Sequence, residues 1–118
     1  MAVKDVVGAY GERVVARTLV EQGWTVIDRN WRCEHGEIDI VAIDDDCLVV
    51  VEVKTRRSDA FGGAIEAVTR RKLLRLRRLA AAWLAAHGGG FSAVRVDVVA
   101  VTLPRAGRAH LEHLKAVA

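Results

Sequence analysis

Residues 36–57 read GEIDIVAIDDDCLVVVEVKTRR, two runs of mainly aliphatic residues on either side of the acidic segment Asp44-Asp45-Asp46. Such a pattern predicts a β-hairpin. We expect a two-residue loop at Asp45-Asp46, with Asp44 facing Cys47. Antiparallel pairing in this register gives the pairs Ile43–Leu48, Val41–Val50, Asp39–Glu52 and Glu37–Lys54.

The charged pairs carry the functional prediction. Directly opposed side chains lie on one face of a sheet with Cβ atoms about 5 Å apart. The carboxylates of Asp39 and Glu52 would repel each other at that distance unless a cation lay between them. Lys54 follows two positions later on the same face. This set of residues is typical of a metal-dependent phosphodiesterase site.

Two alternatives to a metal site are a different register of the hairpin and a solvent-exposed hairpin face. An odd-length loop would place Asp39 and Glu52 on opposite faces, and an edge hairpin could carry its charges simply as a solvated face. The face that carries the charges is half apolar, however, and the other face is wholly apolar, which favours a central sheet covered by helices on both faces. The charges share their face with Val41, Ile43, Leu48 and Val50, and the other face holds Ile38, Ile40, Ala42, Val49, Val51 and Val53.

The first helix is expected over residues 4–22 and is ended by Gly23. Glu12 lies at the edge of its apolar stripe, where it is either an ordinary boundary residue or a member of the hairpin site. Gly8 and Gly11 lower helix stability, so we expect them to allow a close approach of this helix to the sheet. That approach would carry Glu12 toward the hairpin.

The remaining pattern predicts an α-β-β-β-α-β order, with a mixed central sheet flanked by helices in a single domain over residues 1–118. A helix over 70–86 has Thr69 as its N-cap. Asp97 lies in the last long strand and has either a structural role, as a cap or an arginine partner, or a functional one. The other expected segments are a strand at 24–28, loops at 29–35 and 55–68, a strand at 94–101 and a short strand or helix from 109.

The composition indicates the cellular compartment and the absence of a disulfide framework. No apolar stretch approaches the roughly 20 residues of a membrane span, and no signal-peptide pattern is present, so we expect a cytoplasmic protein without a membrane partner. The two cysteines do not suggest a disulfide framework. Cys33 and His35 could bind zinc, but a second Cys/His pair at zinc-site spacing does not follow.

The net charge of +3 is unevenly distributed, because residues 70–78 contain six basic residues and no acidic one. Arg71, Arg75 and Arg78 form a stripe along the second helix. A solvated face is the ordinary interpretation of such a stripe, but like charges at this spacing repel each other. A surface that contacts phosphate groups is therefore favoured.

Asp39 followed by Glu52-Val53-Lys54 resembles the PD-(D/E)xK nuclease pattern. The chain is more specifically similar to the YraN family of small bacterial proteins, which implies a restriction-endonuclease-like fold related to Holliday-junction resolvases. One departure is Leu73, where members of that family commonly have glutamine. The similarity rests on Gly11-Glu12, Gly36-Glu37-Ile38-Asp39, Glu52-Val53-Lys54, Phe61-Gly62-Gly63-Ala64, Val68-Thr69-Arg70-Arg71-Lys72 and Val96-Asp97-Val98-Val99-Ala100.

The resemblance implies a site for Mg²⁺ or Mn²⁺ made by Asp39, Glu52 and the backbone carbonyl of Val53. Glu12 would complete it as an acid carried on a helix. Glu37 would lie just outside the metal ligands or pair with Lys54. The implied catalytic residues are Glu12, Asp39, Glu52 and Lys54.

These features predict a metal-dependent endonuclease that hydrolyses DNA phosphodiester bonds at branched or otherwise structured DNA. Lys54 would position or deprotonate a water molecule, or stabilise charge on phosphorus. RNA is a less favoured substrate, and resolution of a four-way junction would require a homodimer. The alternative is a non-catalytic nucleic-acid-binding module or scaffold. The residues expected to contact the phosphate backbone are Arg56, Arg57, Arg71, Lys72, Arg75 and Arg78.

Overall fold

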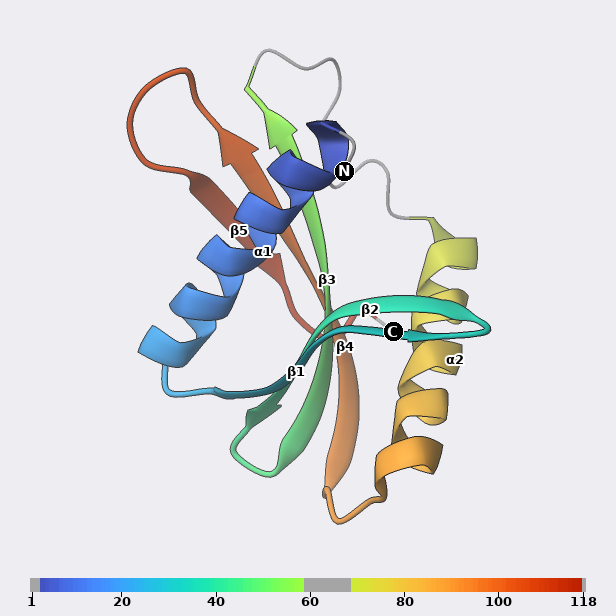
Figure 1. Cartoon of the computed structure of the whole chain (residues 1–118). Helices are drawn as coiled ribbons and strands as arrows, with labels where there is room; N and C mark the ends of the chain where they lie inside the picture. Colours follow the sequence, from blue (N-terminus) through green and yellow to red (C-terminus); the bar gives the residue numbers. More distant parts are fainter. Residues whose placement is uncertain (1–2, 59–68, 118) are drawn as a thin grey trace.

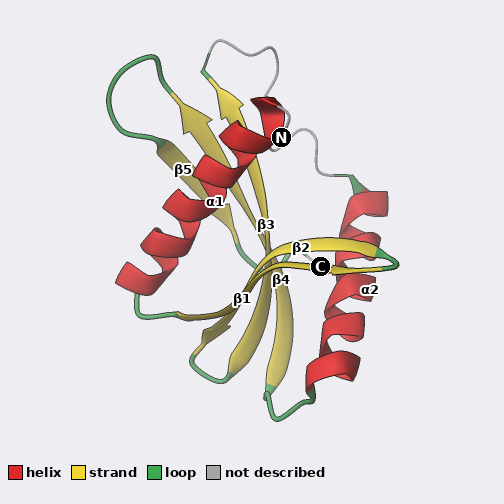
Figure 2. Ribbon diagram, viewed as in Figure 1, coloured by secondary structure: helices red, strands yellow, loops and turns green. Residues whose placement is uncertain are grey.

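The computed structural model describes residues 3–58 and 69–117, which form two helices and one mixed sheet (Figures 1 and 2). The strands follow the order β1-β2-β3-β4-β5, with β3 and β4 parallel and the other neighbours antiparallel. The predicted α/β fold, a mixed sheet flanked by helices, is confirmed. The elements are α1 (Val3–Glu21), β1 (Thr25–Cys33), β2 (Gly36–Asp44), β3 (Cys47–Arg57), α2 (Arg70–His87), β4 (Ala93–Leu103) and β5 (His110–Leu114).

The β2–β3 hairpin has the predicted two-residue turn. Asp45 adopts a φ of 56°, a left-handed conformation that aspartate tolerates better than most residues. The pairs next to the turn are Asp44–Cys47, Ile43–Leu48 and Val41–Val50, as predicted, and the ladder ends at Ile40–Val51. The predicted pairs Asp39–Glu52 and Glu37–Lys54 are therefore wrong, because the two strands separate before these positions.

Both faces of the sheet are covered, as the apolar pattern predicted. Val15 and Leu19 of α1 pack on one face, and Leu76, Leu79 and Trp83 of α2 pack on the other. The α1 face includes Ile40, Ala42, Val49, Val51, Val53, Val99 and Val101, and the α2 face includes Ile38, Val41, Leu48, Val50 and Val96.

Ile38 contradicts the predicted division of faces. It packs in the α2 cluster, whereas Ile40, two positions along the same strand, packs in the α1 cluster. The alternation of a regular strand is therefore broken at Asp39, between them. This break coincides with the end of the β2–β3 ladder.

The segment 29–35 was expected to be a loop, but β1 continues through it to Cys33. It forms a second hairpin with β2, in which Arg32 pairs with Glu37. The register shifts by one residue at Ile27, a β-bulge of the kind found at sheet edges. The end of this hairpin reaches α2, since a Cβ at Gly36 would lie 3.8 Å from Leu79 Cδ1.

The helix boundaries fall within one residue of those predicted. The Lys72 amide donates to Thr69 Oγ1 at 3.2 Å, so Thr69 is the N-cap of α2. Gly23 follows α1 with a φ of 93°, a left-handed conformation that glycine adopts without strain. Neither helix, over the residues described, is long and apolar enough to cross a membrane.

The other boundaries differ more. Residues 55–57 belong to β3 rather than to a loop, and the Phe61-Gly62-Gly63 motif lies outside the described residues. β4 is longer than the predicted strand, and the segment from 109 forms the short strand β5.

Asp97 has the structural role. Its side chain is fully buried and accepts hydrogen bonds from Arg95 Nε at 2.9 Å and from the Ala116 amide at 2.9 Å. His113 Nε2 lies 2.8 Å from the same carboxylate. Burial opposes ionisation of Asp97, but the hydrogen bonds and the charge of Arg95 lower its pKa. Asp97 thus joins β4 to β5 and to the segment that follows β5.

Replacing Asp97 should strongly destabilise the protein. Asp97→Ala leaves buried donors without their acceptor, so we expect the free energy of unfolding at pH 7 to fall by about 3–5 kcal/mol. Because the pKa of Asp97 is lowered in the folded state, its contribution is lost as the pH falls below the ordinary 3.8. Urea unfolding at several pH values measures both effects.

Glu112→Ala, at an exposed position of β5, is the matched control and should change stability by less than about 0.5 kcal/mol. A difference between Asp97→Ala and the parent protein that does not shrink at low pH would contradict the role given to the ionised carboxylate.

Candidate metal centre and basic surface

The candidate site lies where β2 and β3 separate. Beyond the Ile40–Val51 pair, Asp39 Oδ2 accepts a hydrogen bond from the Val53 amide at 2.9 Å. A carboxylate thus replaces the backbone acceptor that β2 no longer supplies. The N–H and C=O groups of one residue in a strand point toward the same neighbouring strand, so the Val53 carbonyl also faces this opening.

Three carboxylates meet at the opening. One oxygen from each of Glu12, Glu37 and Asp39 lies within 4.8 Å of the others. We call these three residues the acidic cluster. Glu12 comes from α1 and the other two come from β2, and all three are half-buried. The helix thus carries the Glu12 carboxylate to the hairpin, as the glycine-bearing face of α1 predicted.

Glu37 is more central than expected. The sequence suggested a place just outside the metal ligands or a pair with Lys54, but Glu37 contributes an oxygen to the acidic cluster. Its Oε2 also lies 2.8 Å from Arg32 Nε of the neighbouring strand. Lys54 pairs instead with Glu52, with 3.5 Å between Nζ and Oε1.

Glu52 lies near the acidic cluster without belonging to it. Its negative charge raises the pKa of both Asp39 and Glu12. The structure therefore brings the predicted residues Glu12, Asp39, Glu52 and Lys54 into one region. However, the carboxylate that lies within 4.8 Å of both Asp39 and Glu12 belongs to Glu37, whereas we expected it to belong to Glu52.

Burial and electrostatic repulsion both oppose ionisation of the carboxyl groups at this opening. Burial, followed by the charge of Glu52, raises the pKa of Asp39 to about 8, although the Val53 amide opposes this shift. Burial and the charge of Glu37 also raise the pKa of Glu12, and Arg29 opposes that increase. Carboxyl groups held in this way gain the most from a divalent cation, which would neutralise the charges that repel each other.

The donor atoms fit a hard cation. Carboxylate oxygens, with a backbone carbonyl beside them, are the ligands that Mg²⁺ and Mn²⁺ prefer over softer metals. Among the described residues, the group of side chains close enough to share an ion is the acidic cluster, and Cys33 and His35 do not form one.

A close contact between α1 and β3 positions Glu12. Gly11 is buried, and a Cβ at this position would overlap with Thr55 Oγ1 and lie 2.9 Å from Thr55 Cβ. The helix can approach β3 this closely only because residue 11 is glycine. A Cβ at Gly8 would meet nothing within 4 Å, so the expectation that Gly8 serves the same purpose is wrong.

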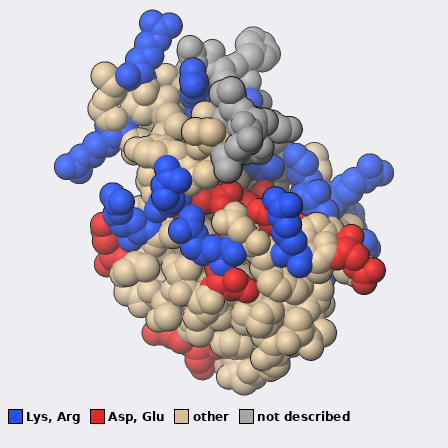
Figure 3. All heavy atoms as spheres, in the orientation of Figure 1, with Lys and Arg blue, Asp and Glu red and all other residues tan. Residues whose placement is uncertain are grey.

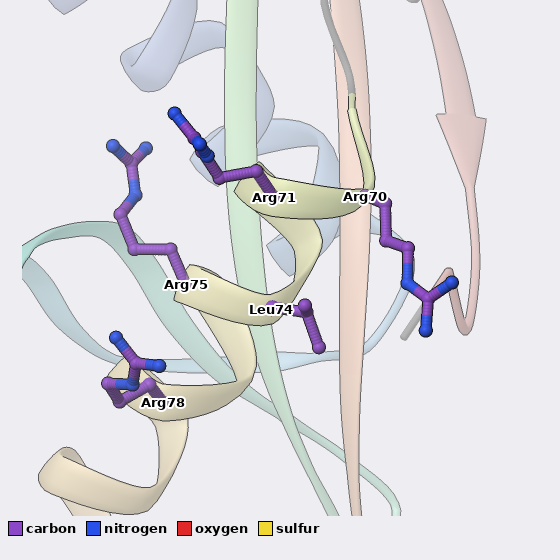
Figure 4. Close-up of a pocket in the computed structure, with 5 residues that line it drawn as sticks. All are labelled: Arg70, Arg71, Leu74, Arg75 and Arg78. Carbon is purple, nitrogen blue, oxygen red and sulfur yellow. The ribbon is translucent and has the colours of Figure 1, made fainter.

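Basic side chains surround acidic ones on the face shown in Figure 3. On α2, an open hollow of about 600 Å³ is lined by Arg70, Arg71, Leu74, Arg75 and Arg78 (Figure 4). We call these five residues the α2 surface. It contains the predicted arginine stripe, and Lys72 on the same helix is half-buried.

The other two predicted contacts lie at the end of β3. Arg57 is exposed and borders a separate hollow of about 360 Å³ with Leu103 and Pro104, and Arg56 is half-buried. The six basic residues predicted to contact phosphate are therefore divided between α2 and the end of β3. Their role in binding stays a prediction.

Sequence reasoning missed the arginines of β1. The charge of Arg29 acts to lower the pKa of Glu12, and Arg32 forms an ion pair with Glu37. Both fell in a segment expected to be a loop. The sequence did contain a signal for this strand. The alternating pattern of residues 36–44 could have paired with a strand before it as well as with the strand after it.

The chain is similar along nearly its whole length to proteins from several bacteria. Residues 11–101 match the family described as "Uncharacterised protein family UPF0102". A UPF0102 protein of Kineococcus radiotolerans is 63% identical over 115 residues, covering 97% of this chain and 94% of the relative. One from Beutenbergia cavernae is 60% identical over 117 residues, and one from Arthrobacter sp. is 52% identical over 117 residues, each match covering 99% of both chains.

The contact of Gly11 with Thr55 gives opposite expectations for two glycines of one helix. Gly11→Ala should lower the free energy of unfolding by about 1–3 kcal/mol and weaken Mn²⁺ binding, because the added methyl group forces α1 and Glu12 away from β3. Gly8→Ala, the matched control, should raise stability by up to about 1 kcal/mol through helix propensity. Urea unfolding and Mn²⁺ titration would measure these effects, and equal responses of the two variants would contradict the positioning role.

The raised pKa of Asp39 gives a pH-dependent prediction for the metal-free protein. Its folded-state pKa of about 8 lies above the ordinary 3.8, so folding becomes less favourable as the pH rises between these values. Asp39→Asn keeps an acceptor for the Val53 amide and cannot ionise. In EDTA, its stability relative to the parent protein should therefore increase from pH 5 to pH 9, as measured by urea unfolding. A constant difference would show that folding does not raise the pKa of Asp39.

Proposed function

The chain belongs to the UPF0102 family, and we propose that it is a metal-dependent endonuclease acting on DNA phosphodiester bonds. The observation that supports this most is the convergence of Glu12, Glu37 and Asp39 beside Glu52 and Lys54. Ordinary folding gives no reason to gather four half-buried acids at one opening in a sheet.

The acidic residues would hold the ion. Asp39 and the other members of the acidic cluster offer oxygen ligands for Mg²⁺ or Mn²⁺, with Glu52 and the Val53 carbonyl at the border of the opening. Such an ion, when bound, supplies positive charge to phosphate oxygens and lowers the pKa of a water molecule. The amide of Val53 keeps the Asp39 carboxylate oriented toward the opening.

Lys54 would act on the phosphate. Glu52 lies 3.5 Å from Nζ and holds the ammonium group beside the carboxylates, and the Lys54 side chain is 30% exposed. From this position the ammonium group can stabilise negative charge on the phosphate as the transition state forms.

The partner that we propose is the sugar–phosphate backbone of DNA. The arginines of the α2 surface are exposed, and guanidinium groups bind phosphate through paired hydrogen bonds. Such contacts position a nucleic acid without reading its sequence. Recognition would then depend on shape, as expected for branched DNA.

Nuclease assays would test the proposal. Labelled four-way junctions, flaps, single strands and linear duplex would be incubated with Mg²⁺, Mn²⁺ or EDTA. We expect cleavage with either metal and none with EDTA. Asp39→Asn and Lys54→Ala should each reduce the cleavage rate by at least about 100-fold, the size of effect seen when one electrostatic group of an active site is removed.

Asp46→Asn changes an exposed acid in the turn of the same hairpin, and it should cut as well as the parent protein. Binding of branched DNA that is unaffected by Lys54→Ala, without cleavage in either metal, would replace the nuclease with a non-catalytic nucleic-acid-binding module. Faster cleavage of RNA with the same branched structure would show that the substrate is RNA rather than DNA, and the proposed site would stay the same.

A further inference from the structure

Leu74 occupies an unusual place on α2. The buried residues of this helix are Leu76, Leu79, Ala80 and Trp83. With 3.6 residues per turn, Leu74 falls opposite to them, at the position farthest from the sheet. Its side chain is 56% exposed. An amphipathic helix normally has a polar residue at such a position.

The surroundings of Leu74 are basic. Arg70 lies on one side of it, and Arg71, Arg75 and Arg78 lie on the other, as Figure 4 shows. All four arginines are exposed, and together with Leu74 they line the hollow of about 600 Å³. The α2 surface thus combines an apolar centre with a cationic border.

Phosphate groups alone do not explain this combination. An aliphatic side chain gains nothing from contact with a phosphate, and it interrupts an otherwise continuous row of guanidinium groups. Exposed nucleic-acid bases, in contrast, offer apolar faces between charged phosphates. In linear duplex these faces are stacked on one another. They become accessible at a branch point, a flap or a single strand. Leucine is among the apolar side chains that proteins insert between bases to unstack them.

We infer that Leu74 contacts an unpaired or unstacked base while the surrounding arginines hold the phosphates on either side of it. This inference rests on the proposed function and narrows its substrate to DNA with exposed bases near a branch. The arginines then supply affinity for any DNA, and Leu74 supplies the preference for branched DNA. The two contributions can be separated because they respond differently to salt and to DNA structure.

The experiment compares Leu74→Gln with Leu74→Met. Glutamine and methionine have similar length and helix propensity, so the pair differs mainly in polarity. Affinities for a four-way junction and for a linear duplex of equal length would be measured in EDTA at several salt concentrations. The junction carries 2-aminopurine, whose fluorescence reports unstacking, at the branch point. Val20→Gln is the matched control, because Val20 is also 56% exposed but lies on α1.

Leu74→Gln should weaken junction binding by about five-fold, change duplex binding less than two-fold and leave the salt dependence unaltered. Leu74→Met and Val20→Gln should bind as the parent protein does. The fluorescence change at the branch point should persist in Leu74→Met and disappear in Leu74→Gln. Arg75→Gln, in contrast, should weaken junction and duplex binding alike and reduce the salt dependence.

Equal affinities of Leu74→Gln and the parent protein for the junction would overturn the role of Leu74 and leave the nuclease proposal standing. A parent protein that binds neither junction nor duplex would overturn both. Displacement of bound junction by an acidic peptide with one large apolar residue, and not by the same peptide with alanine there, would show that the α2 surface serves a protein partner instead.

Discussion

The site depends on the separation of β2 from β3. The two strands pair from their turn as far as Ile40–Val51, and beyond that point β2 continues toward α2 while β3 stays beside β4. This separation leaves backbone groups of β3 without a partner in β2, and the Asp39 carboxylate satisfies the amide of Val53. If the hairpin paired regularly to its end, that amide would bond to backbone and the opening would close.

A second constraint is the mutual repulsion of the acids at this opening. Placing Glu12 and Glu37 beside Asp39 opposes folding at any pH at which all of them are ionised. The protein tolerates this arrangement because two tightly packed clusters hold the elements on either side. In a protein that binds a cation at such a site, the repelling carboxylates lower the stability of the metal-free form and raise the affinity for the cation.

Much of the framework could be predicted from local signals. The acidic turn set the register of the β2–β3 hairpin, and the caps of the two helices, Gly23 and Thr69, were visible in the sequence. The continuation of β1 to Cys33 and the change of face between Ile38 and Ile40 could not be predicted in the same way. Both depend on contacts of the β1–β2 hairpin with α2, which begins 26 residues after the hairpin ends at Asp44. For the same reason, the sequence placed Glu52 directly opposite Asp39, whereas the structure brings Glu37 and Glu12 within 4.8 Å of it.

The hydrogen bonds of Asp97 bear on how the protein is made. The ribosome synthesises the residues of the acidic centre, the last of which is Lys54, about sixty residues before it reaches His113 and Ala116, on which Asp97 depends. Until those residues are synthesised, the carboxylate in β4 has no complete set of donors and its burial is costly. The Asp97 contacts can therefore form only after Ala116 has been synthesised. A chain truncated before His113 would carry every residue of the acidic centre but would leave the buried Asp97 carboxylate without two of its partners.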